Sequence, residues 1–161
     1  MITIYKVQQE DISEVKQVLS HTWKDTYGSF LSDKTIEKVT TVWHDPEALK
    51  AQAMNPEIYF AVAKEEGKIV GLITARKIDD VTIFMNRLYI HPDYQRQGIG
   101  SKLFDSSLEA FPNAKVVRLE VEEENKKGLS FYLKQGFKEV ERKTDEIEGE
   151  ILKSIVMEKI V

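Results

Sequence analysis

One segment near the middle of the chain has the composition of an anion-binding loop. Residues 88–101 read LYIHPDYQRQGIGS: an apolar stretch ends, a short polar loop follows, and Gly98 and Gly100 open an amphipathic pattern. Unpaired N–H groups at a helix N-terminus bind phosphate, aided by the positive end of the helix dipole. Glycines have no Cβ, so they let a bulky anion approach those groups. The segment therefore predicts a phosphate-binding loop.

Three familiar phosphate motifs differ from one another in their spacing. A dinucleotide fold needs a third glycine three residues after the second, and Leu103 stands there. A P-loop needs Lys followed by Ser or Thr, whereas this chain has Ser101 before Lys102. The form that remains is Gln/Arg-x-x-Gly-x-Gly, beginning at Gln95. A tight strand-to-helix turn without a ligand is the alternative.

A second segment lies downstream of the loop. Leu119-Glu120-Val121 is followed by Asn125 and then by residues 128–137, GLSFYLKQGF. Together the two segments resemble the GNAT superfamily of N-acetyltransferases, over about residues 69–137. The resemblance implies an enzyme that moves the acetyl group of acetyl-CoA directly to a primary amine of a small molecule.

The resemblance also implies roles for individual residues. The backbone of Leu88, Tyr89 and Ile90 is expected beside the pantetheine arm, and the loop amides are expected on the pyrophosphate. Tyr132 is expected to protonate the departing thiolate, since a tyrosine hydroxyl is a plausible donor to it; the alternative is a core aromatic. The full set of implied cofactor-binding residues is Leu88, Tyr89, Ile90, Gln95, Arg96, Gln97, Gly98, Ile99, Gly100, Ser101, Asn125 and Lys134.

The acceptor side of the site is less well specified. Trp23-Lys24-Asp25-Thr26-Tyr27 resembles the Trp-x-x-Thr-Tyr segment of the branch that contains bacterial polyamine acetyltransferases. Trp23 and Tyr27 share a helix face, so they could line a substrate-binding wall for an alkyl ammonium, with Asp25 or Glu57 as counter-charge. Equally, they could anchor the helix to the sheet.

No residue stands out as the general base. The strand that carries a Glu in many family members reads Ile83-Phe84-Met85-Asn86-Arg87 here. Asp79, Asp80, Glu120 and an ordered water all remain open. The acidic run from Glu120 to Glu124 favours a solvated loop, with attraction of a cationic acceptor as the alternative.

Hydrophobic spacing predicts an α/β (α+β) fold in a single domain over residues 1–161. We expect a mixed, mainly antiparallel, twisted sheet of about seven strands with helices on both faces. The final strand, 151–160, is expected to offer an edge for a possible homodimer. The expected strands are a short one from Ile2, then 58–63, 69–75, 81–90, 116–121, 137–142 and 151–160; the expected helices are capped at Asp11, at Ser32 or Asp33 and at Asp45-Pro46, and further helices start at Ile99 and run over 126–135.

Composition limits the partners and the compartment. With 23 Lys and Arg against 27 Asp and Glu, the formal charge is −4, which argues against nucleic acid. No segment is apolar enough for a membrane span, and no export signal is seen. Without cysteine, and with His21, His44 and His91 scattered, no metal site is expected. A cytoplasmic enzyme is expected; the alternatives are a protein N-terminal or amino-acid acetyltransferase, or a non-catalytic acyl-CoA sensor.

Overall fold

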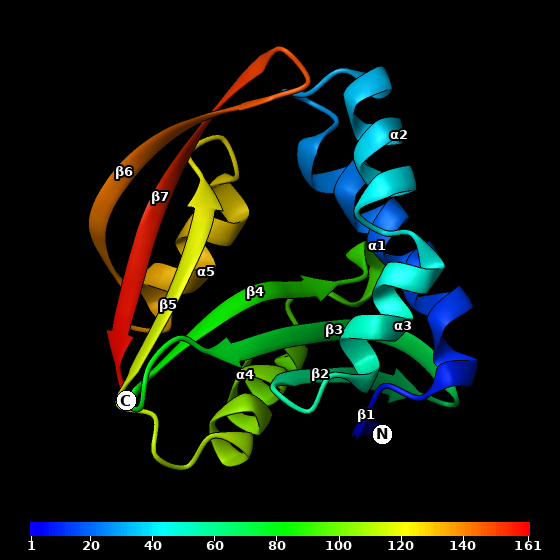
Figure 1. The fold of residues 1–161 in the computed structure, drawn as a ribbon, viewed down its shortest axis with the longest axis vertical. Coiled ribbons are helices and arrows are strands. Elements are labelled where there is room, and N and C mark those ends of the chain that lie inside the picture. The colour runs from blue at the N-terminus through cyan, green and yellow to red at the C-terminus, as the bar shows by residue number, and fades with distance from the viewer.

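The computed structural model describes residues 1–161 and contains a seven-stranded sheet with the order β1-β2-β3-β4-β5-β7-β6 (Figure 1). As predicted, the sheet is mixed and mainly antiparallel. The strands are β1 Ile2–Lys6, β2 Ile58–Glu65, β3 Lys68–Lys77, β4 Thr82–Ile90, β5 Val116–Glu122, β6 Lys138–Ile147 and β7 Glu150–Ile160; the α-helices are α1 Ile12–Tyr27, α2 Asp33–Val42, α3 Pro46–Met54, α4 Ile99–Ala110 and α5 Lys126–Lys134.

The parallel pair, β4 and β5, is short. It runs only from Thr82 opposite Val116 to Phe84 opposite Arg118. Beyond these residues the two strands diverge, and the ribbon opens between them (Figure 1). The end of β4 is still paired with β3, from Leu88 opposite Ile73 to Ile90 opposite Gly71. Its other edge has no strand partner, so an extended ligand can lie along it.

A bulge in β4 shapes the wall of this opening. Thr74 of β3 pairs with Arg87 and the next residue, Ala75, pairs with Met85, so Asn86 is the extra residue. A bulge changes the direction in which the following side chains point. Consequently Leu88 and Ile90 pack into the core under α4, while Tyr89 packs among residues of α1 and β2 on the other face.

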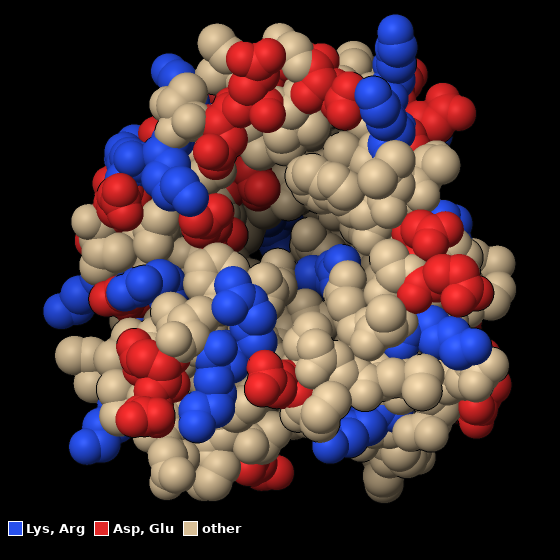
Figure 2. Space-filling view, in the orientation of Figure 1, with Lys and Arg blue, Asp and Glu red and all other residues tan.

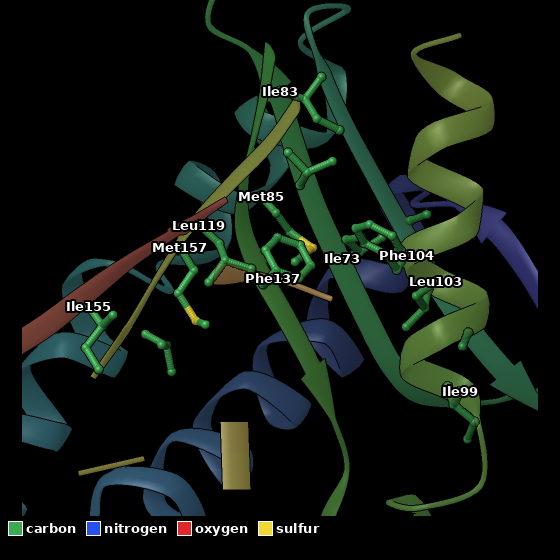
Figure 3. Close-up of a cluster of buried hydrophobic side chains, with 14 of the residues drawn as sticks. Ile73, Ile83, Met85, Ile99, Leu103, Phe104, Leu119, Phe137, Ile155 and Met157 are labelled. Carbon is green, nitrogen blue, oxygen red and sulfur yellow. The ribbon is translucent and has the colours of Figure 1, made fainter. Parts of the chain in front are cut away.

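Helices cover both faces of the sheet, as expected. The largest core lies under α4 and α5 and includes Ile99, Leu103 and Phe104 of α4 (Figure 3). On the opposite face, α1 and α3 pack on β2 and β3 through a second cluster that includes Leu19 and Leu49. No helix is both long enough and apolar enough to cross a membrane.

Two of the predicted helix caps are confirmed and one is wrong. The Ser32 and Asp45 side chains accept hydrogen bonds from Thr35 N and Ala48 N, at the starts of α2 and α3. Asp11, in contrast, makes no side-chain cap to α1. Its carboxylate accepts Gln8 N–H and pairs with Lys64, each at 2.8 Å, because a short 3-10 turn precedes the helix.

The final strand is not an edge, contrary to expectation. β7 lies between β5 and β6, because the chain returns into the sheet after forming the β6–β7 hairpin. The exposed edges are β1 and β6, and β6 presents mostly charged side chains with a bulge between Glu139 and Glu141. Such features discourage strand-to-strand association. The possible homodimer therefore remains a prediction without this support.

Candidate active site

The phosphate loop presents a run of unused hydrogen-bond donors. The backbone N–H groups of residues 96–101 have no acceptor within the protein. Arg96 and Gly98 both have positive φ angles, 63° and 79°, which turns successive amides toward one side. Buried or clustered backbone donors are normally paired, so an unpaired run marks a site for an anion. This geometry agrees with the predicted pyrophosphate loop.

Gln95 and Gly100 have internal roles in this loop. The Gln95 side chain donates to Ile90 O at 3.1 Å and so ties the loop to the end of β4. A Cβ at Gly100 would lie 3.1 Å from Cζ of Phe131, so this glycine allows α4 to pack against α5. The expectation that Gly100 opens a path to the amides is therefore replaced by a packing role. Gln97 and Lys134 are exposed.

The second motif is joined directly to the phosphate loop. Gln135, just after α5, donates to Ser101 Oγ at 3.0 Å, close to the Phe131–Gly100 contact. Asn125 is the N-cap of α5, and its Oδ1 accepts Gly128 N–H at 3.0 Å. The Asn125 carboxamide oxygen thus accepts a bond within the chain, and its NH₂ group is free to donate to a ligand.

Tyr132 lies on α5 where its hydroxyl is free. Its ring packs against Phe131 and Phe137 with centroids 5.4 and 5.6 Å apart. The hydroxyl has no hydrogen-bond partner in the protein, and Tyr132 as a whole is half-buried. Burial raises the pKa of Tyr132, and the charges that can form on Tyr89 and Glu122 raise it further. The hydroxyl therefore keeps its proton at neutral pH and is available as a donor.

Glu122 is a functional candidate that the sequence patterns did not indicate. It lies at the end of β5, and its Oε2 accepts the Tyr27 hydroxyl at 2.9 Å. Burial raises the pKa of Glu122, while the Tyr27 hydrogen bond lowers it. A partly desolvated carboxylate with one donor is suited to accept a proton. The alternation of apolar residues in β5 could have indicated Glu122, because Val117, Leu119 and Val121 are buried and leave Glu122 on the opposite face.

The three residues considered for the base have other positions. Asp79 lies in the β3–β4 turn, and its Oδ1 accepts Val81 N–H and Thr82 N–H at 2.9 and 2.7 Å. Asp80 is exposed in the same turn. Glu120 pairs with Lys143 at 2.7 Å. Glu122 is the carboxylate that lies beside the tyrosine cluster.

Trp23 and Tyr27 are core residues, and the Tyr27 hydroxyl reaches Glu122. They are 5% and 4% exposed and pack with Leu31, Ile36 and Val39. The anchoring role is therefore what the structure shows, while an open aromatic wall is not present. Asp25 and Glu57, the suggested counter-charges, are exposed. The carboxylate that meets Tyr27 is Glu122 instead.

Figure 2 shows a hollow at the centre of the molecule, with basic atoms in its depth and acidic side chains around part of its rim. The hollow coincides with the opening between β4 and β5 in the same orientation (Figure 1). The tip of the β6–β7 hairpin meets α2 above it, where Glu150 accepts from Ser32 N and Ser32 Oγ and Glu148 pairs with Lys38. The hairpin tip and α2 therefore close the opening on this side.

Comparison with known proteins agrees with this geometry. The acetyltransferase (GNAT) family model matches residues 16–137. The chain belongs to the GNAT family. It is accordingly an acetyl-CoA-dependent N-acetyltransferase, and the predicted family, fold and donor are confirmed. The GNAT assignment accounts for the diverging parallel strands and the loop of unpaired amides.

Individual relatives extend the match. A spermidine N(1)-acetyltransferase of Thermoplasma acidophilum is 29% identical over 143 residues, 85% of this chain and 88% of its own length. The crystal structure of a PaiA N-acetyltransferase from Thermoplasma acidophilum in complex with coenzyme A has a TM-score of 0.88 and 28% identity, covering 100% of this chain and 99% of that one. The Escherichia coli ribosomal-protein-S18-alanine N-acetyltransferase, at 16% identity and a TM-score of 0.73 over 100% of this chain and 94% of its own, shares the fold.

Proposed function

We propose that the protein transfers acetyl directly from acetyl-CoA to the primary amine of a small molecule, within the opening between β4 and β5. One arrangement supports the proposal. Unpaired amides at residues 96–101 follow the end of β4, and this end of β4 has a free edge. Two titratable side chains, Tyr132 and Glu122, complete the arrangement. The loop supports donor binding, and the two side chains support proton transfer.

The chemistry requires two proton transfers. Glu122 accepts a proton from the acceptor ammonium and leaves a neutral amine. The amine nitrogen bonds to the thioester carbon, the carbon–sulfur bond breaks, and the Tyr132 hydroxyl gives its proton to the departing thiolate. A β4 backbone amide near Leu88 to Ile90 would stabilise the oxyanion in between. Because a raised pKa makes Tyr132 a weak acid, we expect donation to accompany bond cleavage rather than precede it.

A polyamine is the first candidate acceptor. A relative of this chain is named for spermidine, and Glu122, which takes part in no ion pair, provides negative charge at the opening. An amino acid or a protein N-terminus is the alternative within the same reaction. The cytoplasm, which supplies acetyl-CoA and keeps thiols reduced, fits a chain without cysteine.

The first experiment measures CoA release from acetyl-CoA against spermidine, spermine, aminoglycosides, amino acids and short peptides. Turnover with one class identifies the acceptor. Binding of acetyl-CoA in calorimetry without turnover on any amine would contradict the catalytic proposal and favour a sensor. Absence of acetyl-CoA binding would contradict the role of the amide run.

Tyr132→Phe tests the acid. We expect kcat to fall about 10²–10⁴-fold with the dissociation constant for acetyl-CoA little changed, because only the proton donor is removed. Tyr5→Phe, at a tyrosine 51% exposed on the edge strand β1, is the matched control. Unchanged kcat in Tyr132→Phe would show that the thiolate is protonated by another group.

A further inference from the structure

Arg87 is a half-buried cation without an anionic partner. Its Nη1 donates to Gln52 Oε1 of α3 at 2.6 Å, and this is its only hydrogen bond to the protein. It takes part in none of the ion pairs of the chain. Because Asn86 bulges, Arg87 follows Tyr89 onto the α1–α3 face of β4, on the acceptor side of the opening. Buried charges are normally paired, so this guanidinium has capacity for a ligand.

The surroundings of Arg87 add positive charge and do not neutralise it. Lys16 of α1 acts on the same neighbour as Arg87, His44, but its ammonium is bound to the carbonyls of Thr40 and His44, each at 3.1 Å. His44 is buried, and its pKa is lowered to about 4 by burial, by Arg87 and by Lys16, so it is neutral at physiological pH. Burial likewise lowers the pKa of Arg87. Besides burial, only Tyr89 acts on the Arg87 pKa, and no carboxylate does.

The β5 wall of the opening, across from Arg87, carries negative charge. Glu122 on β5 meets Tyr27 there. Tyr89 packs with the cluster that contains Tyr27, the partner of Glu122, and Arg87 lies two residues before it on the same face of β4. The Glu122 carboxylate and the Arg87 guanidinium also act on the pKa of Tyr89, in opposite directions. A ligand that reaches the thioester past Tyr89 therefore meets an anion on one side and a cation on the other.

We propose that the preferred acceptor carries a carboxylate beside its amine, so that Arg87 binds the carboxylate while Glu122 receives the ammonium. This rests on the proposed function and selects, within the same reaction, the alternative acceptor class of amino acids over polyamines. A pure polyamine fills only the acidic wall and places a second ammonium near Arg87, where like charges repel. A peptide N-terminus offers an amide carbonyl, which a guanidinium binds more weakly than a carboxylate.

The test compares amines that differ only in the carboxylate. Ornithine is paired with 1,4-diaminobutane, lysine with 1,5-diaminopentane, and ornithine amide replaces the charge by a carboxamide. For wild type we expect kcat/KM to be at least about tenfold higher for each amino acid than for its diamine, since a charge-assisted hydrogen bond contributes about 1.5–3 kcal/mol. Ornithine amide should fall between.

Two variants assign the preference to Arg87. Arg87→Gln should lower the ratio of kcat/KM for ornithine to that for 1,4-diaminobutane by roughly tenfold or more, mainly through KM for ornithine. Gln52→Glu leaves Arg87 in place but gives it a carboxylate at the position of its present partner, and should lower the same ratio. Arg76→Gln, at an exposed arginine of β3, is the control and should leave the ratio unchanged.

The outcomes separate this inference from the proposed function. Diamines turned over as fast as amino acids, or a preference that survives both Arg87→Gln and Gln52→Glu, would overturn the role of Arg87 while acetyl transfer stands. No turnover with any amine, with acetyl-CoA still bound, would overturn both. Should Arg87→Gln fail to fold, Gln52→Glu gives the same comparison, with thermal melts as the check.

Discussion

At the scale of single residues, the active site depends on carboxyl and phenol groups that are partly removed from water. Glu122, Tyr27, Tyr89 and Tyr132 influence one another electrostatically, although they come from β5, α1, β4 and α5. Burial moves each pKa upward, so all four groups favour their protonated forms more than in water. The pH dependence of the enzyme should report this cluster.

Glu122→Gln should remove the acidic limb of the pH profile. Because the pKa of Glu122 is raised, the carboxyl group stays protonated to a higher pH than usual, and kcat/KM should rise as it ionises. The variant should be about 10²-fold or more slower, without that limb. Tyr27→Phe is the informative comparison, since it removes the hydrogen bond that lowers the Glu122 pKa. Tyr27→Phe should keep the acidic limb of the pH profile and move it to higher pH. An acidic limb at the wild-type pH in either variant would argue against Glu122 as the base.

His44 makes stability sensitive to acid. Its folded pKa is about 4 against an ordinary 6.5, so between these values the unfolded chain binds one more proton than the folded one. Stability should therefore fall as pH falls from 6.5 to about 4, by at most about 3 kcal/mol from this residue. Urea unfolding at about pH 7.5 and about pH 4.5 checks this. His44→Phe should lose clearly less stability over the interval, and equal losses would be inconsistent with a neutral buried His44.

At the scale of elements, the phosphate loop depends on the backbone shape at Gly98. Gly98 and Gly67 share a φ of 79°, and a Cβ added at either position would have no other atom within 4 Å. Alanine at either position should cost about 1–2 kcal/mol of stability, because L-residues resist this conformation. Only Gly98→Ala should also weaken acetyl-CoA binding, by roughly tenfold in calorimetry. Equal affinity in the two variants would remove Gly98 from the site.

Sequence patterns predicted most elements, because strands and helices depend on local spacing. The two GNAT segments also predicted a donor side, since its loop and helix are continuous in the chain. The acceptor side could not be predicted in the same way. Glu122 and Tyr27 are 95 positions apart, and Arg87 and Gln52 are 35 apart. Their pairing depends on the divergence of β4 from β5 and on a bulge at Asn86, which no short pattern encodes.

The position of the last strand could not be predicted for a related reason. A strand at the end of a chain has the same local pattern whether it lies at an edge or inside the sheet. β7 is inserted between β5 and β6, and its central residues, such as Ile155 and Met157, are buried. Only the pairing of distant strands decides which of them is exposed.

At the scale of the whole molecule, the β6–β7 hairpin joins the two sides of the opening. Glu150 accepts from Ser32 and Thr35 at the start of α2, and these bonds hold the pKa of Glu150 below its usual range. Glu148 makes a single exposed ion pair with Lys38. The hairpin tip therefore has one strong contact and one weak contact with α2.

Glu150→Gln should lower Tm by a few degrees and raise KM for the acceptor, because α2 and the hairpin separate more easily. Glu148→Gln, which removes only an exposed pair, should change both much less. Since the Glu150 pKa is lowered in the folded protein, the stability that Glu150 contributes should be lost as the pH falls through its folded-state pKa. Differential scanning calorimetry at about pH 7 checks the ranking, and the reverse order would place the main contact at Lys38.

The three residue pairs that join β4 to β5 leave two half-sheets with facing, unsatisfied edges. A donor lying between them is therefore both a reactant and a structural brace for the folded state. A ligand present at about 100 times its Kd stabilises a fold by about 2.7 kcal/mol. The abundance and turnover of this enzyme in a cell should consequently follow the supply of acetyl-CoA: a starved cell would degrade it faster, and the acetylating capacity would decline together with the metabolite that it consumes.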